Sequence, residues 1–450
     1  MSPSDTPQAD PSDPSAPSDP SAPSDPSDPS DPGLPATTRE RERIGALDAV
    51  RGLAVLGIVP ANLPAFALPS LADEHAAYVS DAPRELAAFW LQETLVDQKF
   101  ITTFAFLFGV GLELQAERAE RAGRPFEPSY AVRLGLLLAI GLIHALLVWY
   151  GDILFHYALI GFAALFLRKL PTWVVGLLAG LCLCVPVALG GAAWLVAHQR
   201  HPDLDPPRRL ADDLVRARAL EGAPLKLDKA FDPATELRVY GRGTYLEQCL
   251  VRSVNWLMLC MAVLILYSWR ILGLFLLGVV VQRLGLFRDP DRWRGLLAAL
   301  LLAGLLLALP GEALRGAVML GGDHPWPVDM GLEAAHQTCS LLLAGAYLAG
   351  LVLLHGRPLG RRLSAPLTWV GRLALSAYLL ESAIGTTLFY SWGLGWYGQL
   401  SRLQLLGVAA VECLALVLLC RLWLGWFRMG PVEWAWRSLA LGAAQPLRRT

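Results

Sequence analysis

A histidine and an aspartate on either side of a tight turn are the side chains best suited to proton transfer in this chain. His144 lies late in one apolar stretch, and Asp152 lies in the turn Tyr150-Gly151-Asp152 that leads to the next. Because the turn is so short, it should make the flanking segments antiparallel neighbours and bring the carboxylate near the imidazole. A carboxylate fixes the tautomer of a neighbouring imidazole and raises its basicity, so the pair could act as a general base. The alternative is an interfacial histidine beside an Asp that begins a helix.

Other polar side chains are expected at the level of His144. Asn62 lies late in the first apolar stretch, Lys99 opens the second, and His156 and Tyr157 follow the turn. Because they share one depth, these residues could line a common site, in which Asn62 and Lys99 stabilise a developing oxyanion. His156 is the weaker candidate, since its position also suits a purely interfacial role.

A second group of candidates lies at the opposite end of the apolar stretches. Asp48 and Arg51 are three residues apart, so they share one face of a helix and can pair. Arg372 lies at the same end of a later stretch. Arg51 and Arg372 could hold the anionic part of a ligand; the alternatives are a structural ion pair and a simple positive anchor.

Further ionisable residues lie deeper in the apolar stretches. Glu381 and Glu412 are isolated acids in the last two stretches. Since an unpaired charge in lipid is costly, the plain interpretation pairs these acids with Arg270 or Arg421. The remaining deep polar residues are His336 and Gln337.

These residues belong to a chain that is too apolar to be a soluble globular protein. Of its 450 residues, 54% are hydrophobic and 17% are charged, and the mean hydropathy is +0.43. A soluble domain has about 25% charged residues. Each crossing of a bilayer takes about 20 apolar residues, and helices satisfy their own backbone in lipid. The sequence therefore predicts an all-α membrane bundle of about ten transmembrane helices, at 45–68, 99–115, 131–150, 153–168, 172–196, 256–282, 295–318, 331–354, 366–390 and 403–427.

The distribution of Lys and Arg orients this bundle. Both residues concentrate in every second connection, beginning before the first span, so both termini are predicted to be cytoplasmic. The layout has a disordered Pro/Ser/Asp tail at 1–38, a transmembrane bundle at 39–430 with an external loop at about 198–249, and a cytoplasmic amphipathic tail at 431–450. The apolar region Leu250–Leu286 is too long for one upright helix, so we expect an interfacial piece followed by a span. With a net charge of −1, no nucleic-acid partner is indicated, and no metal site is predicted.

Several short motifs occur in a fixed order along the chain. They include Leu47-Asp48-Ala49-Val50-Arg51-Gly52, Lys99-Phe100, Gly141-Leu142-Ile143-His144, Gly151-Asp152-Ile153-Leu154 with Tyr157, Gly371-Arg372-Leu373-Ala374 and Gly430-Pro431-Val432-Glu433-Trp434. Through these motifs the chain resembles the YeiB-like family of bacterial inner-membrane proteins, a group of unknown function. The likeness covers about residues 44–440. It implies a multi-pass protein of the bacterial plasma (inner) membrane.

The YeiB-like family is similar to transmembrane acyltransferases of the heparan-glucosaminide acetyltransferase type, which share the Leu-Asp-x-x-Arg-Gly motif. This resemblance implies transfer of an acyl group from a cytoplasmic thioester donor, such as acyl-CoA, to a small-molecule or lipid/glycan acceptor at or across the membrane. Those relatives place a histidine shortly after the motif. The corresponding stretch here has Asn62 and no histidine, so we expect His144 to be the base.

Two other functions compete with acyl transfer. A transporter or permease of a small metabolite or lipid intermediate would use the same residues as a binding site or proton relay. A scaffold or sensor would use them for neither purpose. In each case the lipid bilayer is the surrounding partner and no permanently bound cofactor is expected. The sequence leaves both a monomer and a homodimer as alternatives.

Overall fold

The computed structural model describes residues 38–69, 82–197, 210–321 and 326–449. Contacts divide the chain into Met1–Arg41 and Glu42–Thr450, and the helical bundle belongs to the second unit. The tail predicted to be disordered, 1–38, lies outside the described residues except for its last position. The beginning of the loop expected at 198–249 also lies outside them.

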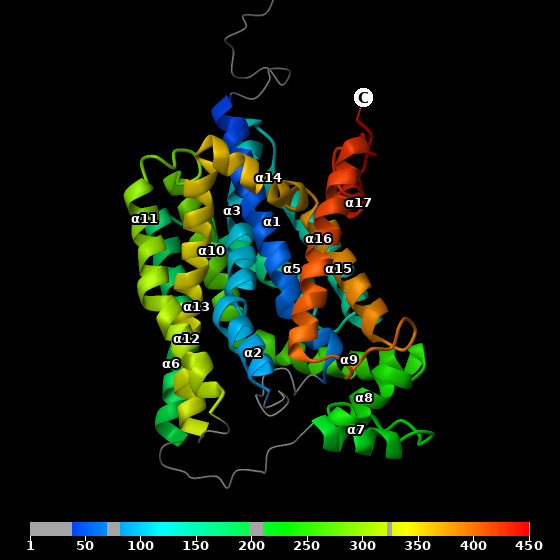
Figure 1. Cartoon of the computed structure of the whole chain (residues 1–450). Coiled ribbons are helices and arrows are strands. Elements are labelled where there is room, and N and C mark those ends of the chain that lie inside the picture. Colours follow the sequence, from blue (N-terminus) through cyan, green and yellow to red (C-terminus); the bar gives the residue numbers. More distant parts are fainter. Residues whose placement is uncertain (1–37, 70–81, 198–209, 322–325, 450) are drawn as a thin grey trace, which may run out of the picture. The chain divides into compact units, whose positions relative to one another are not determined.

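The described residues form helices and no strand, which confirms the all-α fold (Figure 1). The α-helices are α1 (Thr38–Ala67), α2 (Pro83–Leu95), α3 (Lys99–Arg121), α4 (Phe126–Leu147), α5 (Leu154–Leu167), α6 (Thr172–Ala197), α7 (Leu210–Ala219), α8 (Pro233–Arg242), α9 (Tyr245–Ala262), α10 (Ser268–Leu284), α11 (Arg294–Ala303), α12 (Leu309–Met319), α13 (Trp326–His355), α14 (Pro358–Arg372), α15 (Ala374–Phe389), α16 (Arg402–Trp426) and α17 (Pro431–Leu441). The 3₁₀ turn η2 covers Leu227–Lys229, and the π-helical segments η3 and η4 cover Val263–Tyr267 and Gly304–Ala308.

The described part of the chain has the helices of a multi-pass membrane protein. Eight segments are long and apolar enough to cross a membrane, and α5 and α15 are shorter apolar helices. Large apolar side chains on these helices remain exposed, among them Phe166, Trp173 and Leu177. Such surface suits lipid rather than water. The total of about ten crossings and the side on which the termini lie stay predictions.

Two of the expected spans differ in detail. The ninth, expected at 366–390, divides at Leu373 into the end of α14 and the shorter apolar helix α15. The second is preceded by α2, which meets α3 at a break over residues 96–98, so that Pro83–Arg121 forms one long interrupted segment. The long apolar region near Leu250–Leu286 divides as expected. Helix α9 runs across the lower end of the bundle, and α10 rises from it after the π-helical turn η3 (Figure 1).

Two glycines bring α1 and α14 into backbone contact. A Cβ on Gly52 would lie 1.8 Å from the carbonyl oxygen of Leu367, and a Cβ on Gly371 would lie 1.8 Å from that of Asp48. No other residue allows so close an approach. Because each glycine is adjacent to an arginine in sequence, this contact places Arg51 and Arg372 at one level of the bundle.

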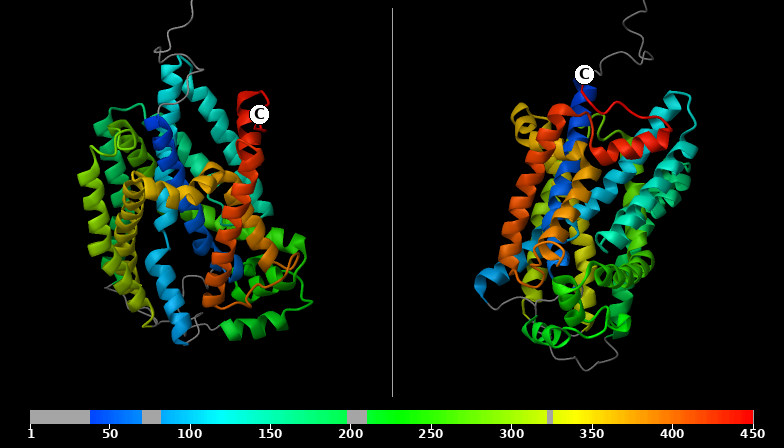
Figure 2. Two further views of the ribbon diagram at one scale, coloured as in Figure 1. Left: turned by 45° about the horizontal axis from the view of Figure 1, so that its top comes forward. Right: turned by 90° about the vertical axis from the view of Figure 1, so that its right-hand side faces the viewer.

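Helix α17 folds back onto the bundle instead of continuing α16. In the right-hand view of Figure 2 it lies across the upper end, beside the beginning of α15. The carboxylate of Glu433 accepts hydrogen bonds from the backbone N–H groups of Leu375 (2.8 Å) and Ser376 (3.1 Å). These are N–H groups that the first turn of α15 cannot satisfy itself.

Candidate functional site

The structure places His144 and Asp152 in direct contact. The ring Nδ1 of His144 lies 2.8 Å from Oδ2 of Asp152, and Oδ1 of Asp152 accepts a hydrogen bond from the backbone N–H of Phe155 at 2.8 Å. Both side chains are buried, with relative exposures of 3% and 2%. The Nε2 atom of His144 is buried and has no partner among the described residues. An ionised Asp152 keeps the proton on Nδ1, so Nε2 is the nitrogen available to accept another.

Close packing of α4 on α5 brings His144 and Asp152 together. Gly141 lies one turn before His144, and a Cβ there would come within 2.3 Å of the Phe155 nitrogen and 2.8 Å of Asp152 Oδ1. The two helices leave opposite ends of the short turn at 148–153 and pack along their length. The sequence predicted this neighbourhood correctly from the turn alone.

Helix α15 closes the other side of the His144 ring. The ring centroids of His144 and Tyr378 are 5.5 Å apart, and the Tyr378 hydroxyl accepts from the backbone N–H of Ile153 at 3.4 Å. His156 contacts the backbone carbonyl of Asp152 through Nδ1 at 3.1 Å, and its buried Nε2 also has no described partner. Two imidazole nitrogens without partners therefore lie close to one turn.

Asn62 lies beside the deep acids rather than in a donor pair with Lys99. Its amide Nδ2 donates to Oε1 of Glu381 at 3.1 Å, and Glu381 is one turn after Tyr378 on α15. Glu381 and Glu412 are close enough to interact electrostatically. The Oε2 atom of Glu381 and both carboxylate oxygens of Glu412 are buried with no partner among the described residues.

The expected pairing of these acids with arginine is wrong. Arg270 donates to the Gln337 carbonyl at 2.8 Å and to the hydroxyls of Thr102 and Ser340 at 2.9 Å each. The Arg421 guanidinium instead lies 4.7 Å from the centre of the Trp369 ring. The partners of the two arginines could not be assigned from the sequence, because the depth of a residue in a helix does not reveal which neighbouring helix its side chain faces.

Lys99 and Tyr157 point away from the His144 pair. Lys99 is fully buried, and its Nζ binds Glu312 at 3.0 Å and the Glu93 carbonyl at 2.7 Å. The Tyr157 hydroxyl donates to the carbonyl of Ile101 at 3.1 Å, and its ring packs in an aromatic group with Phe104, Phe108 and Phe275. The residues expected to share one site thus lie in separate places, and Lys99 and Tyr157 are not part of the site around His144.

The amino-terminal half of α1 gathers positive charge. Arg51 Nη1 binds Asp48 Oδ1 at 3.0 Å, and the Asp48 carboxylate also lies in the field of Arg372 and Arg437. Arg372 is exposed and donates to the backbone carbonyl of Arg428 at 3.2 Å. One aspartate under the influence of three arginines leaves an excess of positive charge, which suits an anionic group.

Sequence reasoning missed Arg437 and Glu433. Both belong to α17, whose return onto the bundle no spacing rule predicts. The sequence signal for α17 was the segment Gly430-Pro431-Val432-Glu433-Trp434, because a proline and an acid are frequent in the first turn of a helix.

The comparisons with known proteins identify relatives whose function is also open. Residues 281–443 match a family model described as a protein of unknown function (DUF418). The chain is 30% identical over 434 residues to the uncharacterized protein YxaH of Bacillus subtilis (strain 168), covering 92% of this chain and 98% of the relative. It is 32% identical over 417 residues to the uncharacterized protein YeiB of Escherichia coli (strain K12), covering 90% and 98%. No solved structure matches.

Proposed function

The chain belongs to the YeiB-like family of unknown function, and from that premise we propose that it is a membrane acyltransferase. It takes an acyl group from a cytoplasmic thioester donor and passes it to a hydroxyl or amine acceptor at or across the membrane. One observation carries the proposal: the buried His144 bonds Asp152 through one ring nitrogen and keeps the other without a described partner.

The His144 pair supplies the general base. Nε2 takes the proton of the acceptor as the acceptor oxygen or nitrogen attacks the thioester carbonyl carbon. The resulting imidazolium is stabilised by Asp152 at 2.8 Å. When the carbon–sulfur bond breaks, the same proton passes to the leaving thiolate, so that thiol and acylated acceptor are released.

Tyr378 is the side chain best placed to stabilise the oxyanion. Its ring lies beside that of His144, and its hydroxyl hydrogen can point to the carbonyl oxygen that becomes negative. A donor fixed in a dry site contributes about 3 kcal/mol to such a transition state. Lys99, which the sequence suggested for this role, is already held by Glu312.

The arginines around the amino-terminal half of α1 bind the anionic part of the donor. Arg51 binds Asp48 and has 30% of its side chain exposed, while Arg372 and Arg437 act on the same carboxylate at longer range. Asn62 follows Arg51 along α1 by roughly 16 Å, at 1.5 Å per residue. An extended thioester arm of a donor such as acyl-CoA bridges that length, with its anionic end at the arginines.

Labelled acyl transfer tests the proposal. Membrane vesicles holding the wild type receive acetyl-CoA labelled in the acetyl group, and incorporation into the membrane or soluble acceptor fraction is followed. We expect His144→Ala to lower incorporation by about 10²- to 10⁴-fold. His156→Ala, which removes a neighbouring buried imidazole, is the matched control. Equal incorporation by wild type and His144→Ala, or none by a folded wild type, overturns the mechanism.

Transport of a small metabolite or lipid intermediate is the second candidate. The observation in its favour is the break between α2 and α3, because interrupted helices with buried charges form the binding sites of many transporters. Uptake of a solute into proteoliposomes without covalent change would select this function over acyl transfer.

A further inference from the structure

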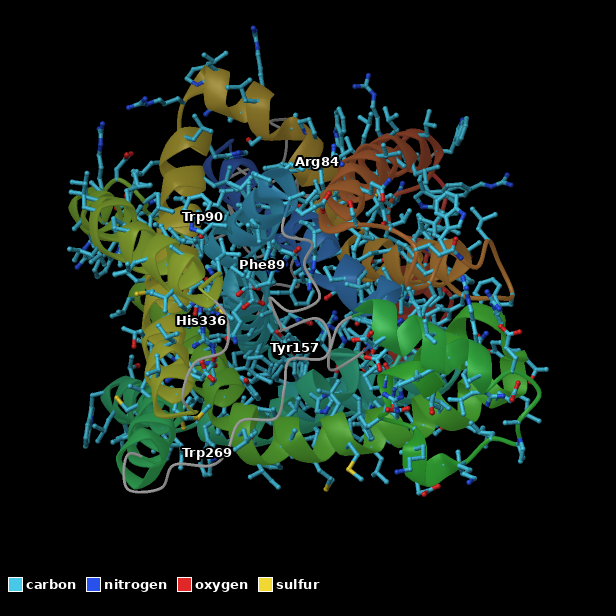
Figure 3. All side chains as sticks on the ribbon, turned by 60° about the horizontal axis from the view of Figure 1, so that its bottom comes forward. Arg84, Phe89, Trp90, Tyr157, Trp269 and His336 are labelled. Atoms are coloured by element: carbon cyan, nitrogen blue, oxygen red, sulfur yellow. The ribbon has the colours of Figure 1, made fainter. Side chains whose placement is uncertain are left out.

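A separate group of buried charges joins the α2–α3 break to α12 and α13. We call it the His336 cluster, and it consists of Glu93, Asp97, Lys99, Glu312, Arg315 and His336. Five of the six residues are buried, and only Asp97 has a partly exposed side chain, at 42%. In the view of Figure 3, His336 lies on the same side of the bundle as Trp90 of α2, whose indole donates to the Ala313 carbonyl of α12 at 2.8 Å.

Glu312 lies at the centre of the His336 cluster. Its Oε2 accepts from Lys99 Nζ at 3.0 Å and lies 3.4 Å from Arg315 Nε. Both carboxylate oxygens lie 2.9 Å from Nδ1 of His336. Arg315 also binds Glu93 at 2.6 Å, so every permanent cation in the cluster has a carboxylate partner.

The His336 ring is held between two carboxylates. While Nδ1 faces Glu312, Nε2 lies 2.9 Å from Oδ2 of Asp97. A neutral imidazole carries one proton, and an ionised carboxylate only accepts. Both hydrogen bonds can exist together only when one extra proton sits on the ring or on one of the two acids.

The same proton decides the charge of the cluster. Glu93, Asp97 and Glu312 supply three negative charges, whereas Lys99 and Arg315 supply two positive ones. With the extra proton the cluster is neutral, and without it one negative charge is left among apolar helices, which is unfavourable. We propose that the His336 cluster is a proton-binding site, distinct from the His144 pair.

The helix break gives this proton a route to water. Gln98, between Asp97 and Lys99, has φ of 56°, a backbone conformation that residues other than glycine adopt rarely. The break turns Asp97 so that its carboxylate contacts His336 while part of it stays exposed. Protons therefore exchange through Asp97, and the strained position marks the element that moves when they do.

Protonation holds the break against α12 and α13. Loss of the proton removes one hydrogen bond of His336 and leaves Glu312 and Asp97 to repel each other across the ring. Among the described residues, the charged groups facing His336 are those of the cluster. Of the neighbouring helices that also pack on α13, α6 has only Cys182 and Cys184 as titratable residues, and α11 has only Arg294. Arg270 and Glu333 reach the break only through Gln337. Both residues bond Gln337, and its side-chain amide lies 3.4 Å from the Gln98 side chain.

Hydrogen exchange of the α2–α3 break tests the proposal without any acyl transfer. The full chain in lipid nanodiscs is compared between about pH 5 and 8, where histidines titrate. We expect the backbone amides of residues 95–102 in the wild type to exchange at least tenfold faster at the upper end, after correction for intrinsic rates. Exchange of these amides in wild type that is independent of pH overturns the proposal.

Two variants separate charge from packing. His336→Lys supplies a permanent positive charge and should protect the break at both ends of the range, whereas His336→Gln should leave it unprotected at both. His156→Gln, a buried histidine outside the cluster, should keep the wild-type profile. If His336→Gln retains the wild-type pH dependence, another group titrates and the site is not His336.

Discussion

The carboxylate of Asp152 lies 2.8 Å from one ring nitrogen of His144, while the other ring nitrogen is buried without a partner in the described part of the chain. Buried polar atoms are normally satisfied, so an unpartnered imidazole nitrogen marks a position where a proton can be received. Because Asp152 occupies Nδ1, Nε2 is the nitrogen of His144 that is available to an acceptor.

Replacing Asp152 by asparagine should lower acyl transfer by about 10²- to 10⁴-fold, while the yield of folded protein should fall little. An amide can still bond the ring, but its N–H favours the opposite tautomer and it cannot stabilise an imidazolium. Incorporation of labelled acetyl groups by Asp152→Asn measures the effect, and thermal unfolding confirms that the variant is folded. Full activity in this variant would show that the carboxylate only begins α5.

Gly141→Ala should destabilise the protein by about 1–3 kcal/mol, because the new methyl group would overlap α5. The Cβ would lie 2.3 Å from the Phe155 nitrogen, a backbone atom that cannot rotate away. Gly135→Ala on the same helix is the control, since nothing lies within 4 Å of its Cβ. The comparison uses the thermal midpoints of the two variants in one detergent, and equal midpoints would contradict the close contact of α4 and α5.

Glu412→Gln should leave stability unchanged or raise it. Both oxygens of Glu412 are buried without described partners, so a neutral amide of the same shape breaks no described hydrogen bond and brings no charge into the interior. The thermal midpoint at neutral pH checks this expectation, with Glu312→Gln as the contrasting variant because its carboxylate binds Lys99 and His336. A fall for Glu412→Gln as large as that for Glu312→Gln would mean that Glu412 has a partner.

The buried tyrosine of α8, Tyr240, should make the protein sensitive to alkali. Burial raises the pKa of Tyr240 well above its usual 10.0, and the nearby Tyr390 and Glu236 raise it further. Because only the unfolded chain ionises this group readily, its contribution is complete below about pH 10 and is lost as the pH rises towards the folded pKa. Tyr240→Phe should weaken this alkaline loss of stability. An unchanged profile between about pH 9 and 11 in that variant would contradict it.

Glu433→Ala should cost about 1 kcal/mol, as does the loss of an ordinary helix cap. The carboxylate accepts from two backbone N–H groups of α15, which no other described side chain bonds. Glu433→Gln should cost less, because the amide oxygen can still accept. Exchange of the amides at 375 and 376 reports the loss directly, and unchanged protection would show that the cap is dispensable.

Local features of the sequence predicted most of what is local in the structure. Apolar length identified the helices, and the short turn before Asp152 predicted its contact with His144. The division of the long region around Val263–Tyr267 was also foreseen from length. Each of these depends on neighbours in sequence, where the geometry of a helix leaves few choices.

Depth alone did not assign contacts between distant helices. Asn62 and Lys99 were expected together, yet one bonds Glu381 and the other Glu312. Rotation of a helix about its axis decides which side chains meet, and that rotation depends on packing partners. Close glycine contacts such as that of Gly52 with the Leu367 carbonyl fix it, and they involve residues with no side chain to suggest it.

The cap on α15 also sets an order of events during synthesis. Leu375 and Glu433 are 58 positions apart, so the ribosome must also make α16 and the beginning of α17 before the first turn of α15 receives its acceptor. Until then the backbone amides of Leu375 and Ser376, at the start of the helix that carries Tyr378 and Glu381, lack the carboxylate that accepts from them. The first turn of α15 therefore acquires its cap only after α17 has been made and has folded back onto the bundle.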